Sequence, residues 1–336
     1  MFILRFDMRA PETGAPARQL YPAAVEICSW AESRGAIMAV LSEHHGTTDG
    51  HLPAPLLLAS AIAARTDRLT LLLAAVVLPL WDPVRLAEEI CVLDLISGGR
   101  IAYAFGIGHR AEEYEHLGVD MDRRGRLADE NLALLLTLLE GDPIVHCGRR
   151  IHVTPGIGRS GGPTILVAGG SIAAAERAAR HGLGLIAQTS APKLREHYET
   201  RCRENGHEPG PVQFPMPGAP TVVFVADDID RAWHELGPYL LHDAQMAASY
   251  RPGDETVASI SRAGSAAALR ADPDSPYRVL DVEQAAEMVQ DGKPLPLLPL
   301  CGGLPPDQAW PYLERAVTAT QRAREGLSPA PVEEIQ

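Results

Sequence analysis

Three things are scarce in this sequence of 336 residues: cysteine, positive charge and long apolar runs. The five cysteines lie far apart without a C-x-x-C pair, which argues against a disulfide or zinc framework and favours reduced thiols in a cytoplasmic protein. The net charge of −13 argues against a nucleic-acid backbone or an anionic membrane as partner. No apolar run reaches the roughly 20 residues that span a bilayer. The first residues, MFILRFDM, become charged too soon for a signal peptide.

What the sequence does contain is a regular alternation of short apolar segments with longer segments of helical spacing. The apolar segments predict buried strands, and the spacing of apolar residues between them predicts helices. Short connections between such elements favour parallel strands joined by right-handed crossovers. About eight strand signals occur, at residues 1–6, 37–42, 69–78, 101–105, 164–168, 183–187, 221–225 and 297–301.

This alternation predicts an α/β fold, a (β/α)8 TIM barrel with insertions, as a single domain over residues 1–326. A doubly wound open sheet is the alternative. Two stretches interrupt the alternation: residues 142–162 predict an inserted hairpin, and residues 243–277 an irregular excursion on the barrel rim. Residues 327–336 are expected to form a C-terminal tail.

Polar residues follow the second predicted strand directly, in the segment MAVLSEHHGTTDG at 38–50. The apolar run ends in Ser42, and Glu43, His44 and His45 come next. Because the strand ends of a barrel share one mouth, we expect these side chains near a site there. A carboxylate beside two imidazoles suits proton transfer near neutral pH, although a solvated loop is the alternative interpretation.

A second polar segment, VAGGS at 167–171, precedes the helix expected over 172–181. Free N–H groups at a helix N-terminus, the bare backbone of Gly169 and Gly170, and the hydroxyl of Ser171 together suit a phosphate group. The alternative is that Ser171 only caps the helix.

Many segments, in order, resemble bacterial luciferase and its flavin-dependent relatives. Residues 41–45, LSEHH, are similar to the L-E-H-H segment of luciferase. The other matching segments are LAAVVLP at 73–79, DPVRLAEE at 82–89, LDLISGGR at 93–100, FGIG at 105–108 and GVDMD at 118–122. The resemblance covers most of the first half of the chain, and more loosely residues 163–171 and the closing strand and helix. It implies a TIM barrel that binds a flavin at the mouth of the strands.

The resemblance also implies roles for individual residues. His44 would be a catalytic base beside the flavin, with Glu43 orienting it or bonding to the flavin edge. Ala74 and Ala75 would lie under the ring, joined by a cis peptide bond. The remaining cofactor-binding candidates are Arg124, Ala168, Gly169, Gly170 and Ser171 near the phosphate, and Thr189 beside the ring. The structural alternatives are an ion pair for Glu43, core packing for the alanines, and a solvated helix start for Arg124.

The sequence departs from luciferase after the fourth predicted strand. Gly108 stands where the luciferase α subunit has a reactive cysteine, and His109 where it has an arginine close to the phosphate. Both residues stay candidates for cofactor binding, and a tight turn would explain the glycine equally well. The differences argue against light emission and predict a different grip on the phosphate.

We therefore predict a luciferase-like monooxygenase that uses reduced FMN and molecular oxygen on a small organic substrate, without a metal and as a homodimer. No nicotinamide-binding fingerprint is clear, so a partner flavin reductase would supply the reduced flavin. One alternative is a dehydrogenase of the same fold that transfers hydride to a deazaflavin coenzyme. The others are a non-catalytic flavin-binding subunit, and a metal-dependent hydrolase using Glu43, His44, His45 and His51.

Overall fold

The computed structural model describes residues 1–158, 161–189, 192–216, 218–251, 253, 257 and 260–326. Ten strands form one sheet in which every pair is parallel. They are β1 (Phe2–Phe6), β2 (Ala36–Leu41), β3 (Thr70–Val77), β4 (Ile101–Gly106), β7 (Thr164–Ala168), β8 (Gly184–Ile186), β9 (Val212–Gln213), β10 (Val222–Val225), β11 (Tyr277–Leu280) and β12 (Leu295–Leu297).

The hydrogen-bonded order of these strands is β11-β10-β12-β1-β2-β3-β4-β7-β8-β9. Successive strands therefore lie side by side from β1 to β9, and β12, the last strand, returns to pair with β1. This is the α/β, TIM-barrel-like arrangement that the sequence predicts. In the described part of the chain, the seam of this barrel falls between β9 and β11, where the hydrogen-bonded order ends on either side.

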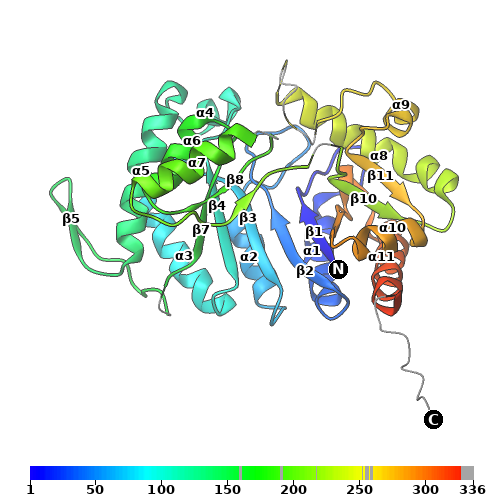
Figure 1. Ribbon diagram of the computed structural model, residues 1–336, viewed down its shortest axis with the longest axis horizontal. Helices are drawn as coiled ribbons and strands as arrows, with labels where there is room; N and C mark the ends of the chain where they lie inside the picture. The colour runs from blue at the N-terminus through cyan, green and yellow to red at the C-terminus, as the bar shows by residue number, and fades with distance from the viewer. Residues whose placement is uncertain are drawn as a thin grey trace, which may run out of the picture.

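Helices connect the strands and lie outside the sheet (Figure 1). They are α1 (Ala17–Glu32), α2 (Pro55–Ala63), α3 (Pro83–Ser97), α4 (Ala111–His116), α5 (Arg124–Leu139), α6 (Ile172–Arg180), α7 (Pro192–Glu204), α8 (Ile229–Ser249), α9 (Ala266–Ala271), α10 (Val282–Gln290) and α11 (Pro306–Gly326), with 3-10 turns η1 (Leu78–Leu80), η2 (Met121–Arg123) and η3 (Cys301–Gly303). Among the described helices, none has the length and hydropathy needed to cross a bilayer.

Local sequence explains where these helices begin and end. Asp82 caps α3 by accepting hydrogen bonds from the backbone N–H groups of Val84 and Arg85, both at 2.9 Å. Pro83 suits the first turn because its missing N–H is unpaired there in any helix. The same helix ends at Gly98, whose φ of 63° is a left-handed conformation that glycine adopts without strain. Such signals fix α3, and so the position of the β3 and β4 ends.

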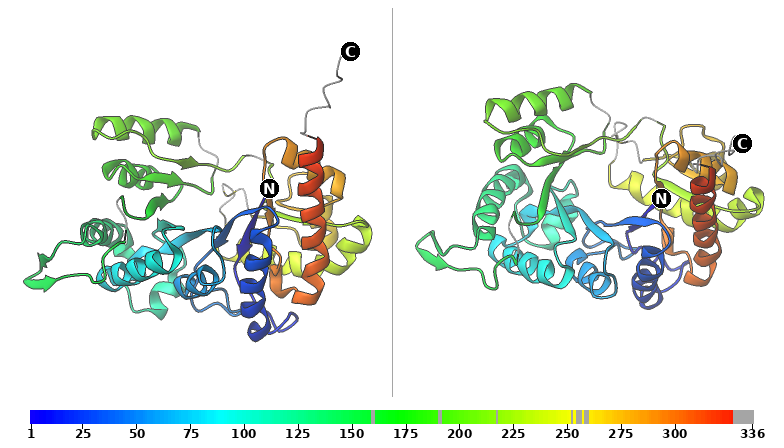
Figure 2. Two further views of the ribbon diagram at one scale, coloured as in Figure 1. Left: turned by 90° about the horizontal axis from the view of Figure 1, so that it is seen from below. Right: turned by 60° about the horizontal axis from the view of Figure 1, so that its bottom comes forward.

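The inserted segment matches the structure predicted from the sequence more closely than the rim does. Residues 142–162 contain the antiparallel pair β5 (Ile144–His146) and β6 (Arg149–Ile151), which projects from the barrel (Figures 1 and 2). The interval 243–277 is more regular than its weak periodicity suggests, because α8 continues to Ser249, α9 follows, and β11 begins at Tyr277. The last strand, β12, lies two residues earlier than expected at its start, and the expected tail 327–336 falls outside the described residues.

Candidate active site

A cavity of about 150 Å³ lies at the barrel mouth and continues inward. Its wall includes His44 after β2, Ala74 in β3 and His109 after β4. The inner part is lined by Arg5 of β1 and Val222 of β10. Active sites of TIM barrels form at this end of the strands, so the cavity lies where the fold predicts a functional site.

The imidazole of His44 is held by a carboxylate that the sequence analysis did not identify. His44 Nδ1 lies 2.6 Å from Oε1 of Glu113, in α4, and the Glu113 side chain is fully buried. The same oxygen accepts hydrogen bonds from the backbone N–H of His45 at 3.1 Å and from Arg110 Nη1 at 3.2 Å. Burial alone would raise the pKa of Glu113, but the hydrogen bond from His44 and these further contacts hold it below its usual value. Because Nδ1 is bonded to Glu113, Nε2 is the ring nitrogen through which His44 can act on a molecule in the cavity.

Glu43 does not orient His44, and it makes the ion pair that is its structural alternative, with His45. Its Oε1 accepts hydrogen bonds from Trp81 Nε1 at 2.9 Å and contacts His45 Nε2 at 2.7 Å, and its Oε2 accepts one from the backbone N–H of Val77 at 2.9 Å. This fully buried carboxylate therefore ties the end of β2 to the end of β3. The partner of His44 is Glu113, not Glu43.

Ala74 lines the cavity, and small residues lie behind it at the ends of β3, β4 and β7. The peptide bond between Ala74 and Ala75 is cis, as the resemblance implies. A Cβ built on Gly106 would lie 3.2 Å from the Ala75 Cβ and 3.7 Å from the Ala168 Cβ, so these three residues pack together. This wall leaves room for a flat ring to approach the backbone.

The Gly108 position has no space for a side chain. Its φ is +67°, and a Cβ there would lie 2.7 Å from Val77 Cγ1. His109 is turned towards the catalytic candidate, since its ring centroid lies 5.7 Å from that of His44. Burial, with the nearby charges of Arg251 and His44, lowers the pKa of His109 to about 4, so the ring is neutral at neutral pH. Its buried Nε2 has no hydrogen-bond partner among the described residues.

The predicted phosphate segment lies at the start of α6. Ser171 Oγ accepts a hydrogen bond from the backbone N–H of Ala174 at 3.2 Å, so Ser171 does cap the helix. A Cβ on Gly170 would collide with Thr189 Oγ1, a buried hydroxyl that has no partner within the described residues. Gly169 donates its N–H to the carbonyl of Ile186 at 2.9 Å. The glycine at 170 thus lets an unsatisfied hydroxyl approach the helix N-terminus.

Arg124 begins α5 and donates from Nη1 to the carbonyl of Met121 at 3.0 Å. The helix that it begins is fastened to α6, because Arg177 donates to Asp129 at 2.8 Å and to the carbonyl of Gly125 at 3.1 Å. The structure therefore brings the helix of Arg124 and the helix of the phosphate segment together, although no hydrogen bond joins Arg124 itself to residues 169–171 in the described residues.

The residues directly after α8 lie over the mouth, within the stretch 243–277 that the sequence analysis assigns to the barrel rim. The ring of Tyr250 lies 5.0 Å from that of His44, and the guanidinium of Arg110 lies 4.3 Å from the Tyr250 ring centroid. Arg251 donates to Gln188 at 2.8 Å across the site. No local pattern gives Tyr250 or Arg251 a role, because both follow the end of α8 and meet His44 and Gln188 only in the folded chain.

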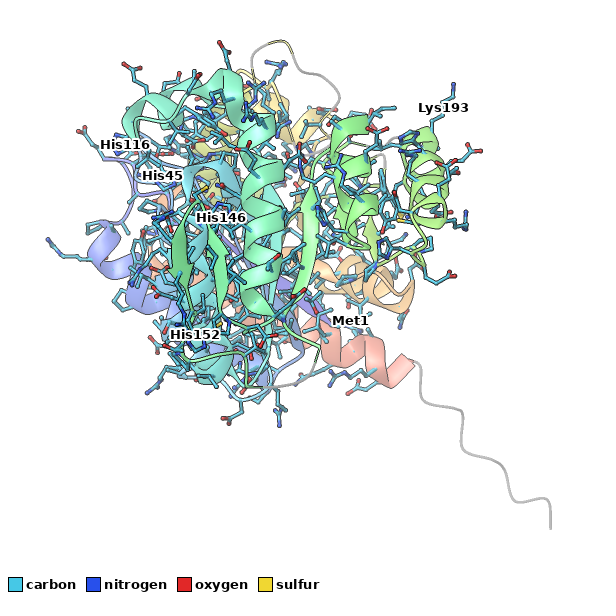
Figure 3. The ribbon with its side chains drawn as sticks, turned by 90° about the vertical axis from the view of Figure 1, so that its left-hand side faces the viewer. Met1, His45, His116, His146, His152 and Lys193 are labelled. Carbon is cyan, nitrogen blue, oxygen red and sulfur yellow. The ribbon has the colours of Figure 1, made fainter. Side chains whose placement is uncertain are left out.

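The histidines that follow β2 do not gather around one point. His45 pairs with Glu43, and in the view of Figure 3 it is labelled close to His116. His51 Nε2 lies 2.9 Å from Ser42 Oγ, and its ring stands edge-on to that of His44 at 4.6 Å. Across the described residues, no three His, Cys, Asp or Glu side chains are arranged to hold a metal ion.

Comparison with known proteins places this site in a family. The family model described as "Luciferase-like monooxygenase" matches residues 2–293. The oxygenase component of a flavin-dependent trigonelline monooxygenase from Acinetobacter baylyi is 32% identical over 127 residues, which are 37% of this chain and 35% of that protein. The chain spans less than half the length of the curated relatives it matches first.

Two solved structures share the fold. Monooxygenase RslO1 from Streptomyces bottropensis is 21% identical with a TM-score of 0.77, covering 96% of this chain and all of that one. The oxygenating constituent of 3,6-diketocamphane monooxygenase from Pseudomonas putida, a type II Baeyer–Villiger enzyme in complex with FMN, is 19% identical with a TM-score of 0.69, covering 98% of this chain and all of that one.

Proposed function

The chain belongs to the luciferase-like monooxygenase family, and from that premise we propose that it uses reduced FMN and molecular oxygen to oxidise a small organic substrate. The observation that carries this proposal is the pairing of His44 with Glu113 at the edge of a cavity whose wall includes Ala74. A positioned imidazole with a buried carboxylate behind it is a proton-transfer group, and the small-residue wall beside it suits a flat cofactor.

The residues at the mouth fit a phosphorylated flavin. The ring would lie against Ala74 and Ala75, and the phosphate near Gly170 and Ser171, where the unsatisfied Thr189 hydroxyl offers a donor. When bound, the reduced flavin supplies the two electrons that activate dioxygen. These protein groups act by binding and orientation, and the covering end of α8 excludes water from the mouth.

His44 would exchange a proton with the substrate or with the reacting oxygen. Glu113 fixes the ring through Nδ1 and stabilises the imidazolium when Nε2 takes up a proton. Arg110, bonded to the same carboxylate, keeps Glu113 ionised and therefore ready for this role. His109 and His51 flank the ring as neutral groups, since burial lowers the pKa of both imidazoles.

We also propose two partners. A separate flavin reductase would deliver the reduced cofactor, as the printed name "oxygenase component" of the trigonelline relative suggests for that protein. A second copy of this chain would cover the apolar face formed by Leu57 of α2 and Val92, Leu95 and Ile96 of α3, whose exposed fractions are 74%, 44%, 49% and 45%. Such a contiguous apolar surface is typical of a protein–protein interface.

The test is an anaerobic titration with reduced FMN, followed by oxygen uptake in the presence of a substrate panel. We expect FMN to bind and oxygen to be consumed, and His44→Asn to lower turnover by about 10²-fold or more while FMN still binds. Binding of a deazaflavin coenzyme with no oxygen uptake would favour the dehydrogenase instead. Unchanged turnover in His44→Asn, with the flavin bound, would remove the proposed proton-transfer role.

A further inference from the structure

The inner wall of the cavity carries a charged cluster that the proposed reaction does not use. Arg9 Nε lies 3.1 Å from Asp243 Oδ1 and 3.3 Å from Asp7 Oδ2, and Arg9 Nη1 lies 2.6 Å from Asp49 Oδ2. Tyr277 donates its hydroxyl to Asp243 Oδ2 at 2.7 Å. All four charged residues are at least 92% buried, with exposed fractions of 8% or less.

The cluster holds more negative than positive charge. Three carboxylates surround one guanidinium, and Asp7 and Asp243, which share its Nε, both line the cavity. Arg5 also lines the cavity and donates to the carbonyl of Thr221 at 2.7 Å. The imidazole Nε2 of His242 lies 3.1 Å from Asp49 Oδ2, so two guanidiniums and one imidazole stand against three carboxylates. A buried negative charge without a partner is costly, so this wall favours a further positive charge.

An unsatisfied hydrogen-bonding atom lies at the same cavity. His51 is 6% exposed, it lines the cavity, and its Nδ1 has no hydrogen-bond partner among the described residues. Its Nε2 lies 2.9 Å from Ser42 Oγ, and when Nε2 donates its proton to that hydroxyl, Nδ1 is an acceptor. Burial, helped by the positive charge of Arg9, lowers the pKa of His51 well below its usual value, so the ring is neutral.

We propose that this wall, Asp7 and Asp243 with His51 Nδ1, binds a positively charged nitrogen of the substrate, an ammonium or a related cation. The inference rests on the proposed function for the oxidised substrate, and it adds the substrate's chemical class. The oxygens of Asp7 and Asp243 each have one contact within the cluster, and a carboxylate oxygen can accept a second hydrogen bond. An ammonium group is a donor only, so it matches these oxygens and the unpartnered imidazole acceptor of His51. A long-chain apolar substrate would leave His51 Nδ1 buried without a partner.

When no cation is bound, a proton on Asp7 neutralises the surplus negative charge of the cluster. Burial and the negative charge of Asp243 raise the pKa of Asp7 to about 7. The cation would replace this proton, so its binding strengthens as Asp7 ionises. The groups that act on the charge of Asp7 are Asp243 of α8, Arg9 after β1 and Cys301 of η3. The other titratable and charged groups of this cluster and of the cavity beside it are Arg5 of β1, Asp49 and His51 after β2, His242 of α8, Tyr250 directly after α8, and Tyr277 of β11.

The experiment compares three probes of equal length by isothermal titration calorimetry on the full chain: butylammonium, 1-butanol and butanoate. Their size suits a cavity of about 150 Å³. We expect butylammonium to bind at least about tenfold more tightly than 1-butanol at pH 8. This ratio corresponds to the contribution of about one charge-assisted hydrogen bond. Its affinity should fall about tenfold between pH 8 and pH 6, because the ionised fraction of Asp7 falls about tenfold across a pKa near 7.

Asp7→Asn should remove both the preference for butylammonium and its pH dependence, whereas the exposed Asp67→Asn, an equal change of charge far from the cavity, should change neither. If Asp7→Asn does not fold, the pH dependence in the unaltered chain decides the matter. Equal affinity for butylammonium and 1-butanol, no butylammonium binding, or tightest binding of butanoate would overturn the proposal. FMN binding is measured in parallel, so a protein that binds FMN but no cation refutes this inference and leaves the proposed function intact.

Discussion

The Gly108 position offers a sharp test of how the mouth is packed. Its φ of +67° would cost an L side chain about 1–2 kcal/mol, and the contact of 2.7 Å between a new Cβ and Val77 Cγ1 would add about 1–3 kcal/mol of overpacking. We therefore expect Gly108→Ala to lower the free energy of unfolding by about 2–5 kcal/mol. A cysteine, the residue of the luciferase α subunit at this point, carries the same Cβ and meets the same obstacle.

The chain contains a matched control at Gly118. Its φ is +68°, but a Cβ there would have no neighbour within 4 Å. Gly118→Ala should therefore cost only the backbone share, about 1–2 kcal/mol. Both variants would be measured by urea denaturation monitored by circular dichroism, with the slope of the transition checked for constancy.

A double-mutant cycle separates the two contributions. Val77 is 4% exposed, and Val77→Ala alone should cost about 2 kcal/mol through the cavity it leaves. Combined with Gly108→Ala it removes the collision, so the pair should be less destabilised than the sum of the single variants by about 1–3 kcal/mol. Strict additivity, or a Gly108→Ala cost equal to that of Gly118→Ala, would show that Val77 does not confine this position.

Three further outcomes follow from the site and the surface. Glu113→Gln keeps the size of the side chain but removes its charge, so oxygen-dependent turnover should fall about tenfold or more with little change in FMN affinity. Steady-state kinetics and a titration with FMN measure these two quantities. Equal turnover would mean that His44 does not need this carboxylate. Because the folded pKa of His109 is about 4, below its usual 6.5, stability should be lost as pH falls from 6.5 to 4, by on the order of 1–3 kcal/mol, and the loss should be smaller in His109→Asn. Chemical denaturation across that range would show an identical loss in both proteins if the reasoning is wrong. Val92→Glu should convert a dimer to a monomer in light scattering, whereas Val145→Glu, on the hairpin and more exposed than Val92, should not; a monomeric parent chain would contradict the proposed interface.

The order of the strands could be predicted from the sequence because each strand carries its own signal. A run such as 69–78 is apolar along its length, as a strand covered on both faces must be, and Asp82 with Pro83 marks the start of the next helix. The short strands β9 and β11 lacked such a signal: β9 has two residues, and β11 lies in a segment rich in small and polar residues. They are strands because of the neighbours they pair with.

The residues of the site that end or follow strands could also be predicted from the sequence, whereas Glu113 could not. His44, Ala74 and His109 follow or end strands, and the shared mouth of a barrel brings such positions together whatever their separation in sequence. Glu113 lies in the short helix α4, which has no clear apolar periodicity, and its contact with His44 joins residues 69 positions apart. The sequence placed a carboxylate next to His44, but the neighbour in the chain, Glu43, points to Trp81 and Val77 instead.

The charged wall shows most clearly what local sequence does not contain. Arg9 contacts Asp243 across 234 positions of sequence, and it contacts Tyr250 across 241. No spacing rule connects residues so far apart, and each aspartate read alone is an ordinary loop or helix residue. Only when β1, α8 and β11 are assembled does the wall acquire its surplus of carboxylates. The substrate of a barrel enzyme is therefore selected by contacts between distant segments, whereas the chemistry is marked by residues that end individual strands.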